Sequence, residues 1–485
     1  MSRELKTLSY EALKELKYEG YLLKEAPERV LQFGEGNFLR AFADYFIDIL
    51  NEKTGFNSKV VAVQPIEGGD AIRNYINEQE GLYTLILRGN ENGRKVSKRR
   101  IISCVSRCLN PYSQYEKVLE CAKNPDLRYI VCNTTEAGIR YDESCRFDDA
   151  PAESYPAKLT RFMYERYKAY GNQQGKGFII LACELIDDNG KELEKCVLKY
   201  AEEWKLEEEF KQWIRDENIF CSTLVDRIVT GYPRREAEDI CKELGYRDNL
   251  IDTGEIFGFW VIEGPDRLKR ELPFEKAELP VLITDNHKPY KERKVRILNG
   301  AHTSMVLGAY LAGRKIVREC MEDNVIREFM NKTIYEEIIP TLSLPKEELK
   351  EFADSVTDRF NNPFIDHELL SIALNSTSKW RARVLPSLKK YIEINNGLPS
   401  CISASMAYYI EFCCRAEIND DRNVEEFYNA HKEEDIGELV ENVLANKEFW
   451  GEDLTMLSGF KEAVKEDISY IRQWGVYEHM KKCVG

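Results

Sequence analysis

The chain is poor in histidine and has no paired cysteine motif. Its five histidines lie at positions 287, 302, 367, 431 and 479, and no two have the spacing of metal ligands. None of the 14 cysteines forms a Cys-x-x-Cys pair, the spacing typical of structural zinc sites. We therefore expect chemistry that needs no metal ion, with the cysteines as free thiols in a reducing cytoplasm.

Long apolar segments and net positive charge are also missing. No apolar run approaches the length of a membrane span, and the polar residues 1–6 are not followed by the apolar core of a signal peptide. The formal net charge of -15 argues against binding to nucleic acid or to anionic membranes. We expect a cytoplasmic protein, a monomer or small homo-oligomer, whose partners are small molecules. An anionic substrate would need a local group of cations.

The 485 residues are too many for a single core, so two domains are expected. Between residues 29 and 284, β-prone segments alternate with helical patterns, which indicates an α/β domain. From residue 291 onward β-prone segments nearly vanish and helical periodicity dominates. We therefore predict an α/β domain over residues 1–285 and an all-α domain over residues 286–485.

A glycine turn follows the first predicted strand. Residues 30–33 run into Gly34-Glu-Gly36, and a helical pattern begins at Phe38. Glycines in such a turn let backbone amides approach a pyrophosphate at the start of a helix. Leu39 stands where a third glycine is usual, so the pattern fits either a dinucleotide site or a plain tight turn.

The second predicted strand, residues 59–64, ends in Gln64-Pro-Ile-Glu67. An acid near this point commonly binds the ribose hydroxyls of NAD, and either Gln64 or Glu67 fits that role. The next basic residue is Arg73, so a 2′-phosphate would find little compensating charge nearby. The pattern favours NAD over NADP.

An amine, an amide and an imidazole lie within nine residues, in Lys294, Asn299 and His302. In a regular helix Asn299 and His302 share a face, and Lys294 begins the helix with a flexible side chain. Reduction of a carbonyl needs a proton for the developing alkoxide and donors that stabilise charge on its oxygen. Lys294 can supply the proton, and the other two can hold the oxygen. The alternative is a cationic helix start with an ordinary Asn and a His whose hydrogen bonds are satisfied.

These motifs resemble those of a known family. Phe33-Gly-Glu-Gly-Asn37-Phe-Leu-Arg40-Ala resembles the nucleotide-binding signature of the mannitol-type, polyol-specific long-chain dehydrogenases. Lys294-x4-Asn299-x2-His302 resembles their catalytic signature, and the similarity covers nearly the whole chain. The resemblance implies a Rossmann-type N-terminal domain, NAD(H), no metal, Lys294 as general acid and base, and Asn299 and His302 on the reacting oxygen.

The signature also assigns residues to the cofactor and to the substrate. Polar residues follow the strand predicted at residues 129–133, where open α/β sheets bind ligands. Arg40 contacts either a cofactor phosphate or the substrate, and the resemblance places Asp226 near the reacting groups. The expected cofactor-binding residues are Gly34, Gly36, Asn37, Phe38, Arg40, Gln64, Thr134, Thr135 and Glu136.

Within the family, several segments are most similar to members that interconvert tagaturonate and altronate. Asn133-Thr-Thr-Glu-Ala-Gly-Ile and Phe220-Cys-Ser-Thr-Leu-Val-Asp226-Arg are two of them. Two positions depart from the mannitol-type pattern, because Leu185 replaces an Asn and Ser371 replaces an Arg. These changes argue against mannitol itself and leave the role of Glu184 open.

A keto-uronate or aldonate carries a carboxylate, and cationic side chains bind such a group. Arg can do so with two parallel N–H donors. Lys379, Arg381 and Arg383 lie within five residues, and in a helix Lys379 and Arg383 share a face. We assign all three to substrate binding, the alternative being a solvated basic helix end. Three functions stay open: NADH-dependent reduction of tagaturonate, the same reaction on fructuronate or a neutral polyol, and nucleotide binding without catalysis.

Overall fold

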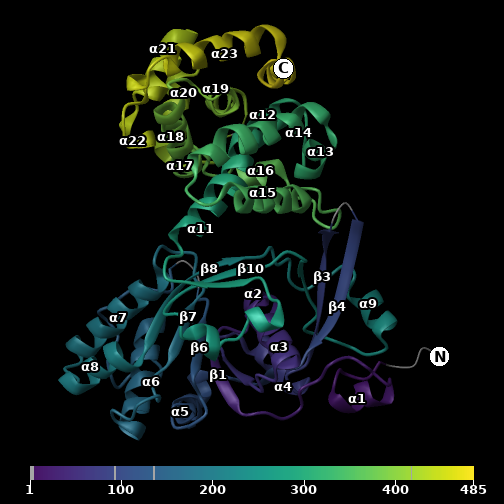
Figure 1. Cartoon of the computed structure of the whole chain (residues 1–485), viewed down its shortest axis with the longest axis vertical. Coiled ribbons are helices and arrows are strands. Elements are labelled where there is room, and N and C mark those ends of the chain that lie inside the picture. The colour runs from purple at the N-terminus through teal and green to yellow at the C-terminus, as the bar shows by residue number, and fades with distance from the viewer. Residues whose placement is uncertain (1–4, 92–93, 135–136, 417) are drawn as a thin grey trace. The chain divides into compact units, whose positions relative to one another are not determined.

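The computed structural model describes residues 5–91, 94–134, 137–416 and 418–485. They fall into two compact units (Figure 1). Unit 1 comprises Met1–Arg88 and Val96–His287, and unit 2 comprises Gly89–Lys95 and Lys288–Gly485. None of the described helices is both long and apolar enough to cross a membrane. The cysteines are free thiols, and most of them are buried.

Unit 1 is built on a sheet that, within the described residues, has the strand order β11-β10-β8-β7-β6-β1-β2-β5. Neighbouring strands pair in parallel, apart from the antiparallel pair β8 and β10. The run β5-β2-β1-β6-β7-β8 has the 3-2-1-4-5-6 order of a doubly wound sheet, which reverses between β1 and β6. This confirms the predicted Rossmann-type domain. The strands are β1 (Glu28–Phe33), β2 (Lys59–Val63), β5 (Val105–Leu109), β6 (Tyr129–Cys132), β7 (Ile179–Ala182), β8 (Ile219–Asp226), β10 (Phe259–Glu263) and β11 (Val281–Thr284).

Helices cover both faces of this sheet and bury one apolar core on each face. Because the central strands are buried on both faces, they are continuously apolar, and every residue of β2 is buried. One face is covered by α3 (Ala43–Thr54) and α4 (Asp70–Glu78). The other is covered by α5 (Pro111–Cys121), α6 (Tyr155–Tyr170), α7 (Asn189–Glu203) and α8 (Glu208–Glu217).

A second sheet, with the order β4-β3-β9 in the described part of the chain, was not predicted. Its strands are β3 (Tyr83–Glu91), β4 (Arg94–Ile102) and β9 (Asp252–Glu255). Most residues of β4 are exposed and many are charged, so the strand lacks the apolar alternation that reveals a half-buried strand. The remaining helices of unit 1 are α1 (Tyr10–Glu15), α2 (Asn37–Ala41), α9 (Ala237–Leu244) and α10 (Leu268–Glu271).

From Lys288 onward unit 2 is helical, as predicted; its other segment, Gly89–Lys95, includes the adjoining ends of β3 and β4. Its central helix α19 (Ser400–Arg415) is buried along most of its length and packs against α12 and α23. An apolar surface all round is the mark of such a core helix. The helices are α11 (Lys288–Arg293), α12 (Ala301–Leu311), α13 (Val317–Glu322), α14 (Asn324–Lys332), α15 (Lys346–Phe360), α16 (Leu369–Ala373), α17 (Ser376–Arg383), α18 (Leu385–Asn395), α19, α20 (Arg422–His431), α21 (Ile436–Leu444), α22 (Lys447–Trp450), α23 (Phe460–Trp474) and α24 (Val476–Val484).

A π-helical segment, Lys294–Gly300, joins α11 to α12. The sequence predicts a regular helix here, with about 100° between successive side chains. A π turn closes its hydrogen bonds between residues five apart and is therefore wider. The angles expected between Lys294, Asn299 and His302 consequently do not apply. Such segments are rare and frequently lie at functional sites.

Candidate active site

The turn Gly34-Glu35-Gly36 joins β1 to α2 where the strand order reverses. Gly34 has a φ of +128°, and a Cβ there would lie 2.9 Å from Leu39 Cδ1. Among the described residues, a Cβ on Gly36 would meet nothing within 4 Å, so this part of the chain leaves the space above the turn open. The turn thus offers the close backbone approach that a pyrophosphate needs. Leu39, at the place of the usual third glycine, is buried in the core.

The side chains next to the turn differ in what they contact. Asn37 is exposed and lies against Gly231, where a Cβ would be 2.4 Å from Asn37 Nδ2. Phe38 is half-buried against the apolar core. Arg40 is buried, and its guanidinium donates to Leu250 O and to Asn37 Oδ1, both at 2.6 Å. Arg40 therefore braces the turn from inside unit 1.

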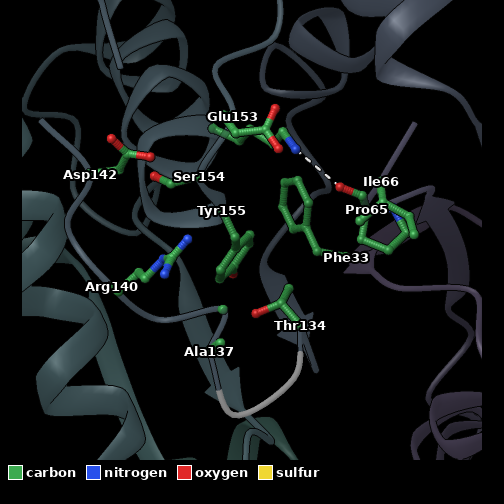
Figure 2. Close-up of a pocket in the computed structure, with 12 residues that line it drawn as sticks. Phe33, Pro65, Ile66, Thr134, Ala137, Arg140, Asp142, Glu153, Ser154 and Tyr155 are labelled. Atoms are coloured by element: carbon green, nitrogen blue, oxygen red, sulfur yellow. Dashed lines mark hydrogen bonds between the residues drawn. The ribbon is translucent and has the colours of Figure 1, made fainter. Parts of the chain in front are cut away.

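A cavity of about 200 Å³ lies beside the turn (Figure 2). It opens beyond the carboxyl ends of β1, β2 and β6, and Figure 2 shows Thr134, Arg140 and Tyr155 around it. Ile66 presents an apolar side chain that is 67% exposed. Of the predicted cofactor residues that the structure describes, only Thr134 lines this cavity. The full lining is Phe33, Pro65, Ile66, Thr134, Ala137, Gly138, Arg140, Asp142, Glu153, Ser154, Tyr155 and Lys158.

One wall of the cavity is fixed by a buried lysine that the sequence analysis missed. Lys158 Nζ donates to Pro65 O and to Tyr112 Oη, both at 3.0 Å. Burial lowers the pKa of Lys158. These bonds hold the loop after β2 against α6. Tyrosine and lysine spaced 46 residues apart give no sequence signal for such a contact.

Gln64 and Thr134 lie at the ends of β2 and β6. Gln64 is fully buried and donates through Nε2 to Ile66 O at 2.8 Å, while its Oε1 has no hydrogen-bond partner in the described structure. Thr134 donates through N and Oγ1 to Glu184 Oε1, at 2.9 and 3.0 Å. Burial raises the pKa of Glu184. Thr135 and Glu136 lie outside the described residues.

Glu184 therefore has an internal role, because it fixes the chain beyond β6. Its neighbour Leu185 is 62% exposed. Asp226, at the end of β8, is buried and lies opposite Phe259 of β10. The structure thus places Asp226 within the main sheet of unit 1.

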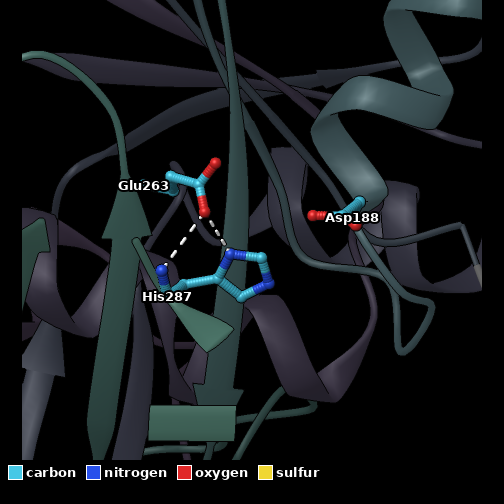
Figure 3. Close-up of side chains that lie close together, drawn as sticks. All are labelled: Asp188, Glu263 and His287. Carbon is cyan, nitrogen blue, oxygen red and sulfur yellow. Dashed lines mark hydrogen bonds and ion pairs between the residues drawn. The ribbon is translucent and has the colours of Figure 1, made fainter. Parts of the chain in front are cut away.

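Asp188, Glu263 and His287 bring their oxygen and nitrogen atoms within 4.8 Å of one another (Figure 3). Lys191 Nζ lies 2.6 Å from Glu263 Oε1 and 3.4 Å from Asp188 Oδ1. His287 Nδ1 lies 2.5 Å from Glu263 Oε2. Burial alone would raise the pKa of Glu263, but hydrogen bonds from Lys191 and His287 lower it to about 2. The positive charge between these carboxylates is the ammonium group of Lys191. The bond from His287 to Glu263 fixes the last residue of unit 1 to the end of β10.

Unit 2 carries the predicted catalytic residues on one continuous helical run. Lys294 and Asn299 are half-buried within the π segment, and His302 lies in the first turn of α12. Thr303 Oγ1 donates to the backbone oxygen of Asn299 at 2.8 Å. This bond does not involve the side-chain amide of Asn299. The run therefore presents an amine, an amide and an imidazole in close succession.

His302 is only 7% exposed, and its ring stacks on Phe360 with centroids 3.9 Å apart and planes at 14°. Burial lowers the pKa of His302 well below its usual value, and the charges of His367, Arg359 and Arg383 lower it further. The imidazole is therefore neutral at pH 7. Its Nε2 atom has no hydrogen-bond partner in the described residues. A neutral ring with an unpaired buried nitrogen suits a bond to a substrate oxygen.

Two of the three predicted cations lie near His302. Arg383 is half-buried, its carbonyl oxygen lies 3.1 Å from the position of a Cβ on Gly300, and burial lowers its pKa. Within the described chain the Arg383 guanidinium makes no hydrogen bond or ion pair. Lys379 donates to Ile372 O at 2.9 Å, and burial, followed by the charge of Arg383, lowers its pKa.

Arg381 lies on the same helix but is exposed, and a Cβ on Gly451 would be 2.5 Å from its Nη2. The structure does not bring Arg381 together with the other two cations. We call the cations Lys379 and Arg383, together with the neighbouring imidazoles of His302 and His367, the cation cluster. This acidic protein therefore has the local positive group that an anionic ligand requires.

Comparison with known proteins follows the same division of the chain. The mannitol dehydrogenase Rossmann domain matches residues 28–276, and the mannitol dehydrogenase C-terminal domain matches residues 286–472. The chain belongs to the mannitol dehydrogenase family. It is therefore a member of an oxidoreductase family, and the resemblance seen in the sequence motifs is confirmed.

Several relatives share almost the full length of this family member. Altronate oxidoreductases of Escherichia coli (strain K12) and of Shigella flexneri are each 50% identical to it over 469 residues, 94% of this chain and 96% of theirs. A Pseudomonas fluorescens mannitol 2-dehydrogenase, solved as a ternary complex with NAD and D-mannitol, is 22% identical with a TM-score of 0.70, covering 98% of this chain and 99% of that one. A substrate-free D-sorbitol dehydrogenase is 22% identical with a TM-score of 0.80, covering 95% and 96%. These two structures confirm the fold.

Proposed function

We propose that the protein is an NAD-dependent oxidoreductase that interconverts altronate and tagaturonate. The observation that carries this proposal is the 50% identity to altronate oxidoreductases over 94% of the chain. The cation cluster supports it independently, because a uronate or aldonate is an anion and a polyol is not. An exposed basic helix end would instead have its cations solvated.

Unit 1, which includes most of the proposed dinucleotide domain (residues 1–285), would hold the cofactor. The open space above Gly36 fits a pyrophosphate at the point where the strand order reverses. The cavity between β2 and β6 fits the adenosine half, with Ile66 as an apolar surface for the base. Asn37, Phe38, Gln64 and Thr134 shape this face, and Arg40 braces it. When bound, NADH supplies the hydride.

Unit 2, which includes the proposed catalytic domain (residues 286–485), would hold the sugar acid. In the direction of reduction, Lys294 donates a proton to the oxygen of the reacting carbonyl, and in oxidation its neutral amine takes the proton back. The Asn299 amide and the neutral His302 ring donate hydrogen bonds to the same oxygen as charge develops on it. Lys379 and Arg383 bind the carboxylate. Arg381 and Asp226, predicted with them, remain candidates for substrate contacts.

Replacement of Gly36 by alanine tests the cofactor face. Gly36 has a φ of -69°, and a Cβ there meets no described atom within 4 Å, so Gly36→Ala should fold normally. Its methyl group would occupy the space needed by the pyrophosphate. We expect the Kd of NADH, measured by fluorescence titration, to rise roughly tenfold, which corresponds to ~1.4 kcal/mol.

The neighbouring glycine serves as the matched comparison. Gly34→Ala should lower the melting temperature, because its φ of +128° and the contact with Leu39 strain any side chain there. An unchanged Kd of NADH in Gly36→Ala would show that the pyrophosphate does not lie over this turn.

A substrate panel tests the proposed activity. The purified protein is assayed with NADH against tagaturonate, fructuronate and fructose, with NADPH as the cofactor control. We expect the highest kcat/KM for tagaturonate and the lowest for fructose, which offers no carboxylate to Lys379 and Arg383. Equal activity on fructose would contradict an anion-selective site. Binding of NADH without turnover of any of the three would identify a nucleotide-binding protein without catalysis.

A further inference from the structure

We propose that His367 is a further substrate-binding residue, which donates a hydrogen bond to the carboxylate of the sugar acid beside Lys379 and Arg383. This inference rests on the proposed function, since the ligand group is the anionic end of that substrate. His367 lies 65 positions after His302 and outside both sequence motifs, so the motifs do not indicate it.

The backbone around His367 is firmly held, while its ring has no hydrogen bond in the described structure. The residue lies between α15 and α16. Val317 N donates to His367 O at 3.0 Å, and Ile316 and Glu368 form an isolated β-bridge. The ring meets His302 edge to face, with centroids 5.6 Å apart and planes at 89°. His367 is thus a positioned side chain that has hydrogen-bonding capacity left over.

Several elements bring positive or ionisable groups to this place. His302 comes from α12, Arg359 from α15, and Lys379 and Arg383 from α17. Burial, followed by the charge of Lys379, lowers the pKa of His367. Each positive charge therefore lowers the pKa of the basic groups next to it. This is the expected effect of like charges in a partly desolvated site.

Two acids beside the cluster, Asp366 and Asp420, are engaged elsewhere. Asp366 Oδ1 pairs with Arg318 at 2.5 Å. Asp420 Oδ2 accepts hydrogen bonds from Thr377 N and Oγ1, at 2.9 and 2.8 Å. Its charge raises the pKa of Lys379, but the two described side chains form no salt bridge. Within the described residues, neither Arg383 nor Lys379 forms a salt bridge. Because no described acid neutralises these two cations by a salt bridge, an outside anion can pair with them.

The chemistry of the cluster matches one carboxylate group. A carboxylate has two oxygens and about four lone-pair sites. Arg383 offers a fork of parallel N–H donors, Lys379 an ammonium, and His367 one ring N–H. His302 would bind the reacting oxygen and not the carboxylate, because its burial and its stacking on Phe360 keep the ring neutral. The same cluster would therefore bind the two ends of the sugar acid with different residues.

The test compares His367→Ala and His367→Gln with wild-type protein on whichever sugar acid of the panel is reduced fastest. Loss of a hydrogen bond to a charged group should raise KM roughly tenfold to a hundredfold in His367→Ala. The kcat and the Kd of NADH should stay close to wild-type values. His367→Gln keeps an N–H donor and should recover part of the loss. His431→Ala removes an imidazole that pairs with Glu434 at 2.7 Å and serves as the matched control.

The outcomes separate this inference from the proposed function. If fructuronate is reduced faster than tagaturonate, the proposed substrate is wrong, while a raised KM in His367→Ala still supports the inference. An unchanged KM, or a fall in kcat at constant KM, overturns the role of His367 whatever the substrate. If no sugar acid turns over, altronate is titrated calorimetrically into the NADH-bound protein. Weaker binding to His367→Ala than to wild type then supports the inference, and equal or absent binding overturns it.

Discussion

Lys294→Ala is expected to lower kcat for tagaturonate reduction by about 100-fold or more, the usual contribution of a positioned general acid. The alanine variant leaves the carbonyl oxygen its two hydrogen-bond donors, Asn299 and His302, but removes the proton source. Because Lys294 acts on the substrate oxygen and not on the dinucleotide, the Kd of NADH should change little. Steady-state kinetics and NADH fluorescence titration measure the two quantities.

Lys390→Ala is the matched control for this experiment. Lys390 lies on α18 of the same unit and pairs with Glu393 on the protein surface, so its removal should leave kcat unchanged. A Lys294→Ala variant with near-normal kcat would rule out the role of Lys294 as general acid. A large rise in the Kd of NADH would instead show that the substitution had disturbed cofactor binding.

Arg383→Ala should raise KM for tagaturonate roughly tenfold to a hundredfold, with a much smaller effect on fructose. A charge-assisted hydrogen bond contributes about 1.5–3 kcal/mol, and every ~1.4 kcal/mol is tenfold in affinity. The half-buried guanidinium of Arg383 has no partner among the described residues of the chain, so the substitution leaves no buried acid behind. Loss of affinity would then report the contact with the substrate itself.

Arg422→Ala provides the control, since Arg422 is exposed and pairs with Glu426 within its own helix. The same measurement on Arg381→Ala decides whether the third predicted cation also contacts the substrate. If Arg383→Ala raised KM equally for tagaturonate and for fructose, Arg383 would support the shape of the site rather than bind the carboxylate.

Much of the architecture follows from local patterns in the sequence. Strand, glycine turn, helix and strand in residues 28–63 are as predicted, because buried parallel strands are short apolar runs and the turn needs glycine. The helical periodicity of the sequence runs through residues 457–482, but Gly475, with a φ of +91°, separates α23 from α24 there. The sheet of β3, β4 and β9 was missed, and exposed charges mask the strand pattern of β4.

The motifs name the candidate site residues, but they do not give the environment of those residues. Nothing in the sequence indicates that Phe360 stacks on His302, since 58 positions separate the two rings. Likewise, Arg40 fits a phosphate contact by its motif, whereas the structure bonds it to Leu250 and Asn37 inside unit 1. Side-chain contacts between distant segments depend on the tertiary fold, which periodicity and spacing do not encode.

The most direct test of the central claim follows the hydride itself. The protein is incubated with tagaturonate and NADH that carries deuterium at the reactive carbon of the nicotinamide, and the product is examined by mass spectrometry and NMR. We predict altronate with one deuterium at the carbon that was the ketone. Unlabelled product, label at another carbon, or no product would contradict the account.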